Sequence, residues 1–370
     1  MDKKISGRLV SLDVFRGLTI IAMILVNNAG NWNYVYPPLL HSEWNGWTPT
    51  DLIFPFFLFI VGVAMTFSFT KLKESNAPKG VVYKKVIKRS LIIFLLGVFL
   101  NVFPFFQVSP FQFIDLSSFR ILGVLQRIAV AYLFASIIIL EFNKAWQFII
   151  TFILLIIYWL LMKLIPVPGF GAGNLSVDGN LVGYIDRLVL GKHLYTPNFD
   201  PEGLLSNIPA ISSALFGVIT GSLLQTDKSK EEKTNFMFVY GSIGLVLGLI
   251  LNYWFPINKQ LWSPSYVIFT TGFALIVFAI CFWLTDVKQS SWWTKPSLVY
   301  GMNAIAVYVL SSAIAKLLYL IGTKTFIENK ILANIFSDPY HASLAYPVLH
   351  ILFWLWIMSI LYKKKIFIKV

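Results

Sequence analysis

His41 is the side chain in this sequence best suited to acid–base or nucleophilic chemistry at neutral pH. It opens the stretch HSEWNGWTPTD, a polar segment with two tryptophans that leads directly into an apolar run. An imidazole can take a proton from an attacking amine or hydroxyl, and it can also accept an acyl group itself. The alternative is an ordinary loop histidine hydrogen-bonded at a membrane surface. Position alone favours that alternative, because no partner group is evident.

Two neighbours of His41 have both a structural and a functional interpretation. Asp51 follows Thr48 and Pro49 in the pattern of a capping box, so we predict that it starts a helix whether or not it also orients His41. Trp44 could stack on a sugar ring, but tryptophans at a membrane surface are also the expected aromatic belt. The stretch DPEG from Asp200 is likewise interpreted as a helix start with an acidic first turn.

Polar side chains within apolar segments indicate a hydrated pocket between helices. Asp13 and Arg16 are three residues apart and can pair on one helix face. Arg127 is expected well inside a helix, two turns from Arg120 on the same face. An arginine at bilayer depth costs at least about 2.5–3.5 kcal/mol unless it faces a polar cavity or a partner. Further polar groups in the predicted helices are Asn27, Asn28, Gln126 and Asn303.

The composition is that of a membrane protein. Of the 370 residues, 57% are hydrophobic and only 13% are charged, about half the charged share of a soluble protein. A spanning helix needs about 20 apolar residues. Ten segments qualify, near 12–30, 51–70, 86–104, 119–140, 146–165, 205–225, 234–255, 264–285, 297–321 and 344–362. We therefore predict an all-α polytopic membrane protein, with a single transmembrane domain over residues 1–370.

The net charge of +13 is explained by topology, and no nucleic acid partner is expected. With the N-terminus inside, the inner segments hold 20 basic residues, among them Lys3, Lys4, Arg8 and Lys369, and the outer loops hold 5. Both termini are thus predicted to be cytoplasmic, and loops 31–50 and 166–204 extracytoplasmic. The stretch YIDRLVLGKHLY in the second loop is expected to form a short amphipathic helix at the surface. Two Gly-x-x-x-Gly patterns, at Gly217 and Gly244, predict close helix packing.

Six blocks of the sequence occur in a familiar order. They are SLDVFRGLTIIAMILVNNAG, HSEWNGWTPTDLIFPFFLFIVG, GVLQRIAVAY, GYIDRLVLGKHLY, DPEGLLSNI and GMNAIAVY. In this set the sequence resembles the heparan-α-glucosaminide N-acetyltransferase family of transmembrane acetyltransferases. The resemblance implies that acetyl from cytosolic acetyl-CoA passes to the amine of a glucosamine-type sugar on the extracytoplasmic side. It implies no metal.

The resemblance also implies roles for individual residues. His41 corresponds to the family histidine, as acetyl carrier or general base, and Asn27 corresponds to an asparagine at the reaction centre. On this basis we expect the acetyl-CoA-binding residues to be Arg16, Gln126, Arg127 and Asn303. The expected acceptor-binding residues are Trp44 and Asp51.

The setting implied by the resemblance is a bacterial-type enzyme in the cytoplasmic (inner) membrane. Because the sequence begins almost at the first shared block, we expect it to lack the lumenal region and additional spanning helix of the animal enzyme. The expected partners are acetyl-CoA, an amino sugar or glycan acceptor and membrane lipid, with a homo-oligomer as a further possibility.

Other functions remain as alternatives. O-acetylation of a surface glycan differs only in the acceptor atom, which the sequence does not specify. A multi-pass small-molecule transporter also suits buried charges, although paired half-repeats and broken helices, which mark many transporters, are not evident in the sequence. A non-catalytic scaffold would leave the polar groups within the helices unexplained.

Overall fold

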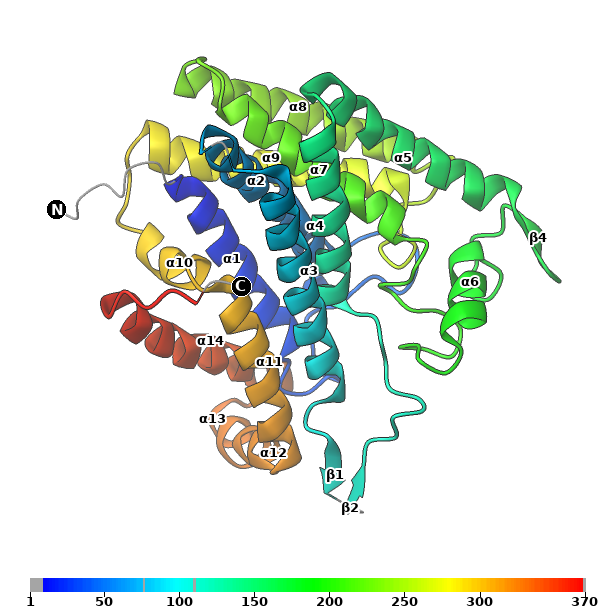
Figure 1. The fold of residues 1–370 in the computed structure, drawn as a ribbon. Helices are drawn as coiled ribbons and strands as arrows, with labels where there is room; N and C mark the ends of the chain where they lie inside the picture. The colour runs from blue at the N-terminus through cyan, green and yellow to red at the C-terminus, as the bar shows by residue number, and fades with distance from the viewer. Residues whose placement is uncertain (1–8, 76, 109–110, 369–370) are drawn as a thin grey trace.

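The computed structural model describes residues 9–75, 77–108 and 111–368, and most of its regular structure is helical (Figure 1). Lys3, Lys4, Arg8 and Lys369, four of the predicted inner charges, lie outside these residues. The long helices are α1 (Val10–Asn27), α2 (Ile53–Glu74), α3 (Lys79–Val102), α4 (Val124–Glu141), α5 (Lys144–Leu164), α7 (Asn207–Leu224), α8 (Lys230–Leu251), α9 (Pro264–Phe282), α11 (Ala304–Leu320) and α14 (Pro339–Lys363). The predicted all-α polytopic fold is confirmed.

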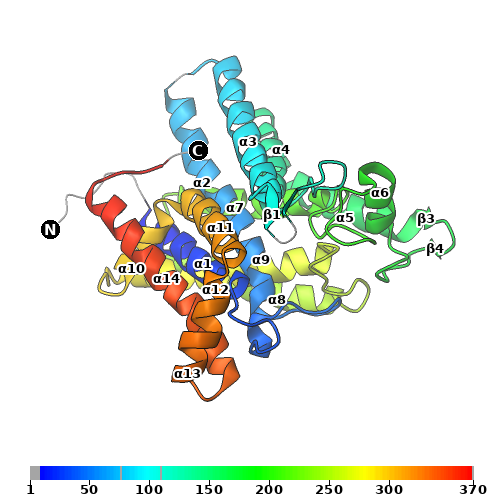
Figure 2. The ribbon, with the colours of Figure 1, turned by 90° about the horizontal axis from the view of Figure 1, so that it is seen from below.

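Shorter elements lie between these helices. They are α6 (Leu181–Leu190), α10 (Thr294–Gly301), α12 (Thr323–Phe326), α13 (Ala333–Ile335), the 3₁₀ turns η1 (Pro37–Leu39) and η2 (Pro49–Leu52), and the π-helical segments η3 (Trp283–Val287) and η4 (Ile327–Leu332). Two antiparallel hairpins pair β1 (Phe106–Val108) with β2 (Phe111–Phe113) and β3 (Pro166–Val167) with β4 (Gly171–Ala172). Both hairpins project beyond the helix bundle in Figure 1, and Figure 2 shows the β3–β4 hairpin at one edge. Helix α6 confirms the short helix predicted in the 166–204 loop.

Side-chain caps explain where several helices begin. The side chains of Asn143, Asn180 and Ser263 accept backbone N–H groups in the first turns of α5, α6 and α9. The capping box predicted at Thr48 and Asp51 is confirmed, and it forms η2, which leads straight into α2. The helix start predicted at DPEG is wrong. These residues form turns, and α7 begins only at Asn207.

Eight helices within the described residues are long and apolar enough to cross a membrane, and a bent pair would make a ninth. Helix α3 has 24 residues, but Lys84, Lys85, Lys88 and Arg89 lie in its first half and keep it outside this class. The predicted number of about ten spans is reached when α3 and the bent pair are both included. The chain is an integral membrane protein.

Two predicted spans have a different form in the structure. The segment expected as one helix over 297–321 is broken after Gly301, and α10 and α11 meet at 83°. This bent pair is a broken span or a re-entrant loop, and it is not evident in the sequence. The segment expected over 119–140 becomes helical only at Val124, so Arg120 lies in the preceding loop and Arg127 in the first turn of α4.

Glycines allow neighbouring helices to approach closely. A Cβ on Gly62 of α2 would lie 1.8 Å from the carbonyl oxygen of Ala214, and a Cβ on Gly217 of α7 would lie 2.0 Å from that of Phe59. Such spacing leaves no room for a side chain, so α2 and α7 form a tight central pair. Gly248 of α8 packs against Phe269 of α9 in the same way, as the second Gly-x-x-x-Gly pattern predicted. Helices α5, α8 and α14 are mostly exposed and lie at the periphery (Figure 1).

Candidate active site

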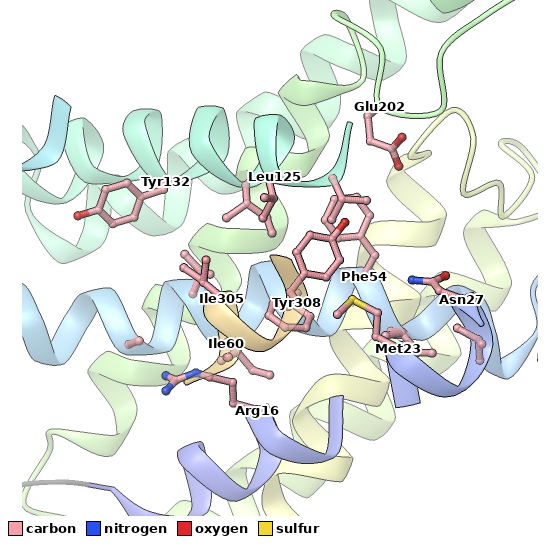
Figure 3. Close-up of a pocket in the computed structure, with 18 of the residues that line it drawn as sticks. Arg16, Met23, Asn27, Phe54, Ile60, Leu125, Tyr132, Glu202, Ile305 and Tyr308 are labelled. Carbon is pink, nitrogen blue, oxygen red and sulfur yellow. The ribbon is translucent and has the colours of Figure 1, made fainter. Parts of the chain in front are cut away.

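A cavity of about 830 Å³ runs through the centre of the bundle (Figure 3). Its walls come from α1, α2, α4 and α11, with contributions from the loops before α4, α7 and α9. On the predicted topology, Arg16 of α1 and Arg89 of α3 line its inner part. His41, Glu202 and Lys259 line its outer part. The volume lies within the usual range of about 300–1,000 Å³ for ligand pockets.

The ring of His41 is fixed by Asp51 at the outer part of the cavity. Its Nδ1 lies 2.6 Å from Oδ1 of Asp51, which is fully buried. The other carboxylate oxygen accepts the backbone N–H groups of Ser42 and Thr48, each at 3.0 Å. An ionised carboxylate is only an acceptor, so Nδ1 carries the proton that Asp51 accepts. The capping residue of α2 thus also sets the tautomer of the candidate catalytic base.

Lys259 is the third member of this cluster, and sequence reasoning counted it only as an outer-loop charge. Its Nζ lies 2.9 Å from Nδ1 and 3.1 Å from Nε2 of His41, and 3.6 Å from Oδ1 of Asp51. Burial lowers the pKa of Lys259, while the charges of Asp51 and Glu202 act in the opposite direction. No local pattern marks this lysine, because it lies 218 residues from His41.

Asn27 is the last residue of α1, and its side chain lines the cavity near Met23 (Figure 3). Asn28 donates instead to the carbonyl of Ile24 in its own helix, at 2.8 Å. The two adjacent asparagines therefore differ in their environment, and Asn27 shares the cavity with His41.

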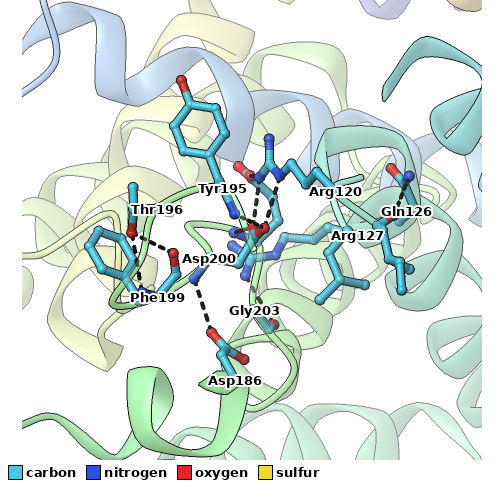
Figure 4. Close-up of polar contacts among 12 residues, drawn as sticks. Arg120, Gln126, Arg127, Asp186, Tyr195, Thr196, Phe199, Asp200 and Gly203 are labelled. Carbon is cyan, nitrogen blue, oxygen red and sulfur yellow. Dashed lines mark hydrogen bonds and ion pairs between the residues drawn. The ribbon is translucent and has the colours of Figure 1, made fainter. Parts of the chain in front are cut away.

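A second polar cluster surrounds Arg120 at the outer part of the cavity (Figure 4). Its Nε donates to Asp200 at 2.8 Å, its terminal nitrogen pairs with Asp200 and Glu202, and its guanidinium lies 4.5 Å above the Tyr195 ring. Burial acts to lower the pKa of Arg120, but the bonds to Asp200 and the charge of Glu202 outweigh it and raise that pKa. Arg120, Tyr195 and Glu202 line the cavity. Sequence reasoning did not select Glu202 and Tyr195, because nothing local links them to Arg120.

Arg127 and Gln126 hydrogen-bond the loops next to the start of α4. Arg127 is buried, donates to Ser206 and to the carbonyl of Gly203, and lies 4.7 Å from the centre of the Trp262 ring. Gln126 donates to the carbonyl of Ile121 at 2.8 Å. Both side chains fix loops that border the cavity.

The inner part of the cavity is bounded by basic residues and by the C-terminal segment. Arg16 pairs with Asp13 at 3.0 Å, as predicted, and Arg89 lies 4.9 Å from the Tyr132 ring centre. The Asn303 amide bonds the backbone of Ile366 and Ile368 at 3.2 and 2.8 Å. Phe367 and Ile368 in turn line the cavity, so Asn303 holds the segment that borders it.

Trp44 connects the two outer loops. Its Nε1 donates to the carbonyl of Leu175 at 2.9 Å, and its ring meets that of Phe199 edge to face at 5.2 Å. These contacts give Trp44 a packing role between loops 31–50 and 166–204. Within the described residues, no group of three or more His, Cys, Asp or Glu side chains is arranged to hold a metal ion.

Residues 8–250 match the family model for heparan-alpha-glucosaminide N-acetyltransferase, catalytic. The chain belongs to this family. Similar proteins include the heparan-alpha-glucosaminide N-acetyltransferase of Mus musculus, 31% identical over 425 residues, which cover 99% of this chain and 61% of that protein. The Homo sapiens protein of the same name is 31% identical over 421 residues, covering 98% of this chain and 60% of its own length. The chain thus spans about three-fifths of these relatives.

The family blocks seen in the sequence meet at one place in the fold. The first supplies Arg16 and Asn27 to the cavity, the second supplies His41, and the DPEG block supplies Glu202. Asp51, also in the second block, bonds the ring of His41. The GYIDR block joins them through Asp186, whose carboxylate accepts the N–H groups of Leu204 at 2.9 Å and Asp200 at 3.3 Å (Figure 4). These family residues are therefore brought together by tertiary structure, although the chain separates them by up to 186 positions.

Proposed function

We propose that this protein is a transmembrane acetyltransferase that moves acetyl from cytosolic acetyl-CoA to the amine of a glucosamine-type sugar on the extracytoplasmic side of a bacterial cytoplasmic membrane. One observation carries the proposal. A single cavity contains both Arg16 and Arg89, toward the predicted inner side, and His41, in an outer loop. A long, thin thioester arm lying in such a cavity would bring its acetyl group to the histidine without crossing the membrane as a whole.

The charge of the cavity supports an anionic donor. Among the described residues that line it, Arg16, Arg89, Arg120 and Lys259 are basic and Glu202 is the one carboxylate. The Nε–H of Arg89 is buried and has no hydrogen-bond partner within the described part of the chain. Arginines bind phosphate strongly. We assign Arg16 and Arg89 to the phosphate-bearing end of the donor, with Asn303 supporting the C-terminal wall beside them.

At the outer end, His41 and Asn27 would perform the chemistry. In one scheme, Nε2 of His41 attacks the thioester carbonyl, the Asn27 amide donates to the developing oxyanion, and the coenzyme A thiolate leaves. The acceptor amine then attacks the acetyl carbon, the bond from that carbon to Nε2 breaks and leaves the neutral ring with its proton on Nδ1, and the proton of the amine passes to water. In the other scheme, both substrates bind together and His41 only removes the amine proton. Gln126, Arg127 and Trp44 would hold the surrounding loops, and Asp51 would orient the ring.

The test is acetyl transfer across a sealed membrane. We expect that proteoliposomes containing glucosamine inside, supplied with acetyl-CoA outside, form N-acetylglucosamine inside and release coenzyme A outside. His41→Ala is expected to abolish both products. Acetylation only when donor and acceptor share a compartment would contradict the proposal, and hydroxyl acetylation of the recovered sugar would favour the O-acetyl alternative.

The break between α10 and α11 is the one observation that favours a transporter. Broken helices often mark transport sites, and Gly301 and Met302 at this break line the cavity. The same proteoliposomes separate the two functions. Sugar uptake without acetyl-CoA turnover would support transport, whereas turnover with labelled acetyl recovered inside would support the enzyme.

A further inference from the structure

Lys259 is held against His41 by hydrogen bonds between two loops. The Gly46 N–H donates to the carbonyl of Ile257 at 2.7 Å, and Asn258 Nδ2 donates to Asn45 Oδ1 at 3.2 Å. These bonds join the loop before α9 to the loop that carries His41. The Lys259 side chain is 12% exposed, so its ammonium lies in a defined position and is not a mobile surface charge.

Several charged groups face this pair from different elements. Asp51 of η2 contacts both His41 and Lys259. The charges of Glu202, in the loop before α7, and of Arg127, in α4, also act on Lys259. Asp51 accepts Nδ1–H, which by itself would favour a positively charged ring. The ammonium lies about 3 Å from both ring nitrogens. Two positive charges this close, partly shielded from water, repel strongly.

We propose that Lys259 is a positioning residue that keeps the His41 ring neutral, so that the electron pair on Nε2 is available at physiological pH. The carboxylate of Asp51 fixes which nitrogen carries the proton, and the ammonium of Lys259 prevents a second proton from binding. When Nε2 reacts, the ammonium can move its hydrogen bond to Oδ1 of Asp51, which is already 3.6 Å away. The effect of Lys259 on turnover rests on the proposed function. Its effect on the protonation of His41 does not.

The direct test measures the reactivity of His41 with diethylpyrocarbonate, which modifies neutral imidazole. The intact protein in detergent is treated over a range of pH, and modified peptides are quantified by mass spectrometry. In Lys259→Met, we expect the midpoint of His41 reactivity to rise by about one pH unit or more. Lys259→Arg, which keeps a cation, should retain the wild-type midpoint. A midpoint that does not move in Lys259→Met would overturn the proposal.

Controls separate a charge effect from a folding defect. His193 and His341 are reported by the same digest, and unchanged reactivity at both indicates an intact fold. Lys330→Met removes an exposed lysine of another outer segment and should behave as wild type. Lys259→Gln is a second neutral variant should Lys259→Met not fold.

Turnover gives the second measurement. The acid limb of the kcat/KM profile for acetyl transfer should move upward in Lys259→Met by the same amount as the reactivity midpoint, with the rate at alkaline pH less affected. If the wild-type protein transferred no acetyl group, the proposed function would be refuted, but the reactivity of His41 would still test the role of Lys259. An active wild type with the same profile in Lys259→Met would refute the role of Lys259.

Discussion

Asp51 shows how one side chain can serve both folding and chemistry. One of its oxygens accepts the N–H of Thr48, at the start of η2, and the N–H of Ser42, next to His41, and the other oxygen contacts the His41 ring. The main-chain carbonyl of the same residue accepts the hydroxyl of Tyr266 at 2.5 Å. The start of α2 is therefore fixed from several directions, and the histidine is aligned by a group that cannot move without unwinding that start.

The two roles of Asp51 can be separated by substitution. Asp51→Asn keeps the size of the side chain but removes the ionised acceptor for Nδ1–H, so we expect acetyl transfer to fall roughly 10²–10⁴-fold. Thr48→Ala weakens the cap at a cost of about 0.5–2 kcal/mol and leaves the contact between Asp51 and His41 in place. Steady-state turnover and thermal unfolding of both variants provide the comparison. Equal losses of activity in the two variants would mean that Asp51 acts only as a cap.

Individual functional residues can be predicted from the sequence when they belong to a local pattern or to one of the family blocks. Asp51 is recognisable as a cap from its neighbours, and His41 and Asn27 from the resemblance. Lys259 and Glu202 are not recognisable, because their partners are fixed only when distant loops come together. In a count of basic residues, Lys259 is only one of the charges of the predicted outer loops. Such a count gives no information about the 2.9 Å contact between its Nζ and Nδ1 of His41.

Among the elements, the sequence predicts helices better than their interruptions. A run of apolar residues over 297–321 satisfies the length of a span, so the break after Gly301 cannot be recognised from hydropathy. Close tertiary packing accompanies the break. A Cβ on Gly301 would lie 2.0 Å from the carbonyl oxygen of Asp13, so α10 packs directly on α1. At the DPEG turn, Asp200, the residue expected to cap a helix, is bound by Arg120 and by Asp186.

Helix α6 and the DPEG turn are joined by a carboxyl group whose titration should affect stability. Burial raises the pKa of Asp186 to about 6, although the N–H groups of Leu204 and Asp200 act against this. An unfolded aspartate titrates near 3.9, so the folded protein binds this proton more tightly. At pH values below the pKa of the unfolded aspartate, the bound proton stabilises the fold by about 3 kcal/mol. This stabilisation is lost as the pH rises through about 6.

Asp186→Asn cannot titrate, so we expect it to flatten this part of the stability profile. The measurement is thermal unfolding of the detergent-solubilised protein between about pH 4.5 and pH 7. Asp227→Asn, which changes an exposed carboxyl in the loop before α8, should retain the wild-type profile. Identical profiles for Asp186→Asn and the wild type would show that Asp186 does not titrate in this range.

For the molecule as a whole, the fold class can be predicted from the sequence, but the arrangement of the helices around the cavity cannot. Composition and basic-residue distribution are sufficient for a polytopic helical protein, because lipid requires backbone groups to bond within each helix. They do not specify which polar helix faces meet. Arg16 and Asn27 line the cavity, as a hydrated pocket would require. Arg127 and Gln126 bond to neighbouring loops, because the helix that carries them begins four residues after Arg120.

The proposed transfer depends on an open connection between the two ends of the cavity. Ile305, near the start of α11, lies between Arg16 and the α4 side chains Leu125 and Tyr132 in Figure 3. Ile305→Trp places an indole in this connection. We expect turnover of acetyl-CoA to fall at least about tenfold, because the thioester would no longer reach Nε2.

A small donor supplied from the outer side should bypass that obstruction. The His41 side chain is 44% exposed, so p-nitrophenyl acetate can approach it without entering the inner half of the cavity. Its hydrolysis, followed by release of nitrophenol, should remain near the wild-type rate in Ile305→Trp and disappear in His41→Ala. Leu310→Trp, on an exposed face of the same helix, should leave both reactions unchanged. Loss of both reactions in Ile305→Trp would point to a general distortion of α11, whereas retention of both would mean that acetyl-CoA reaches His41 by another path.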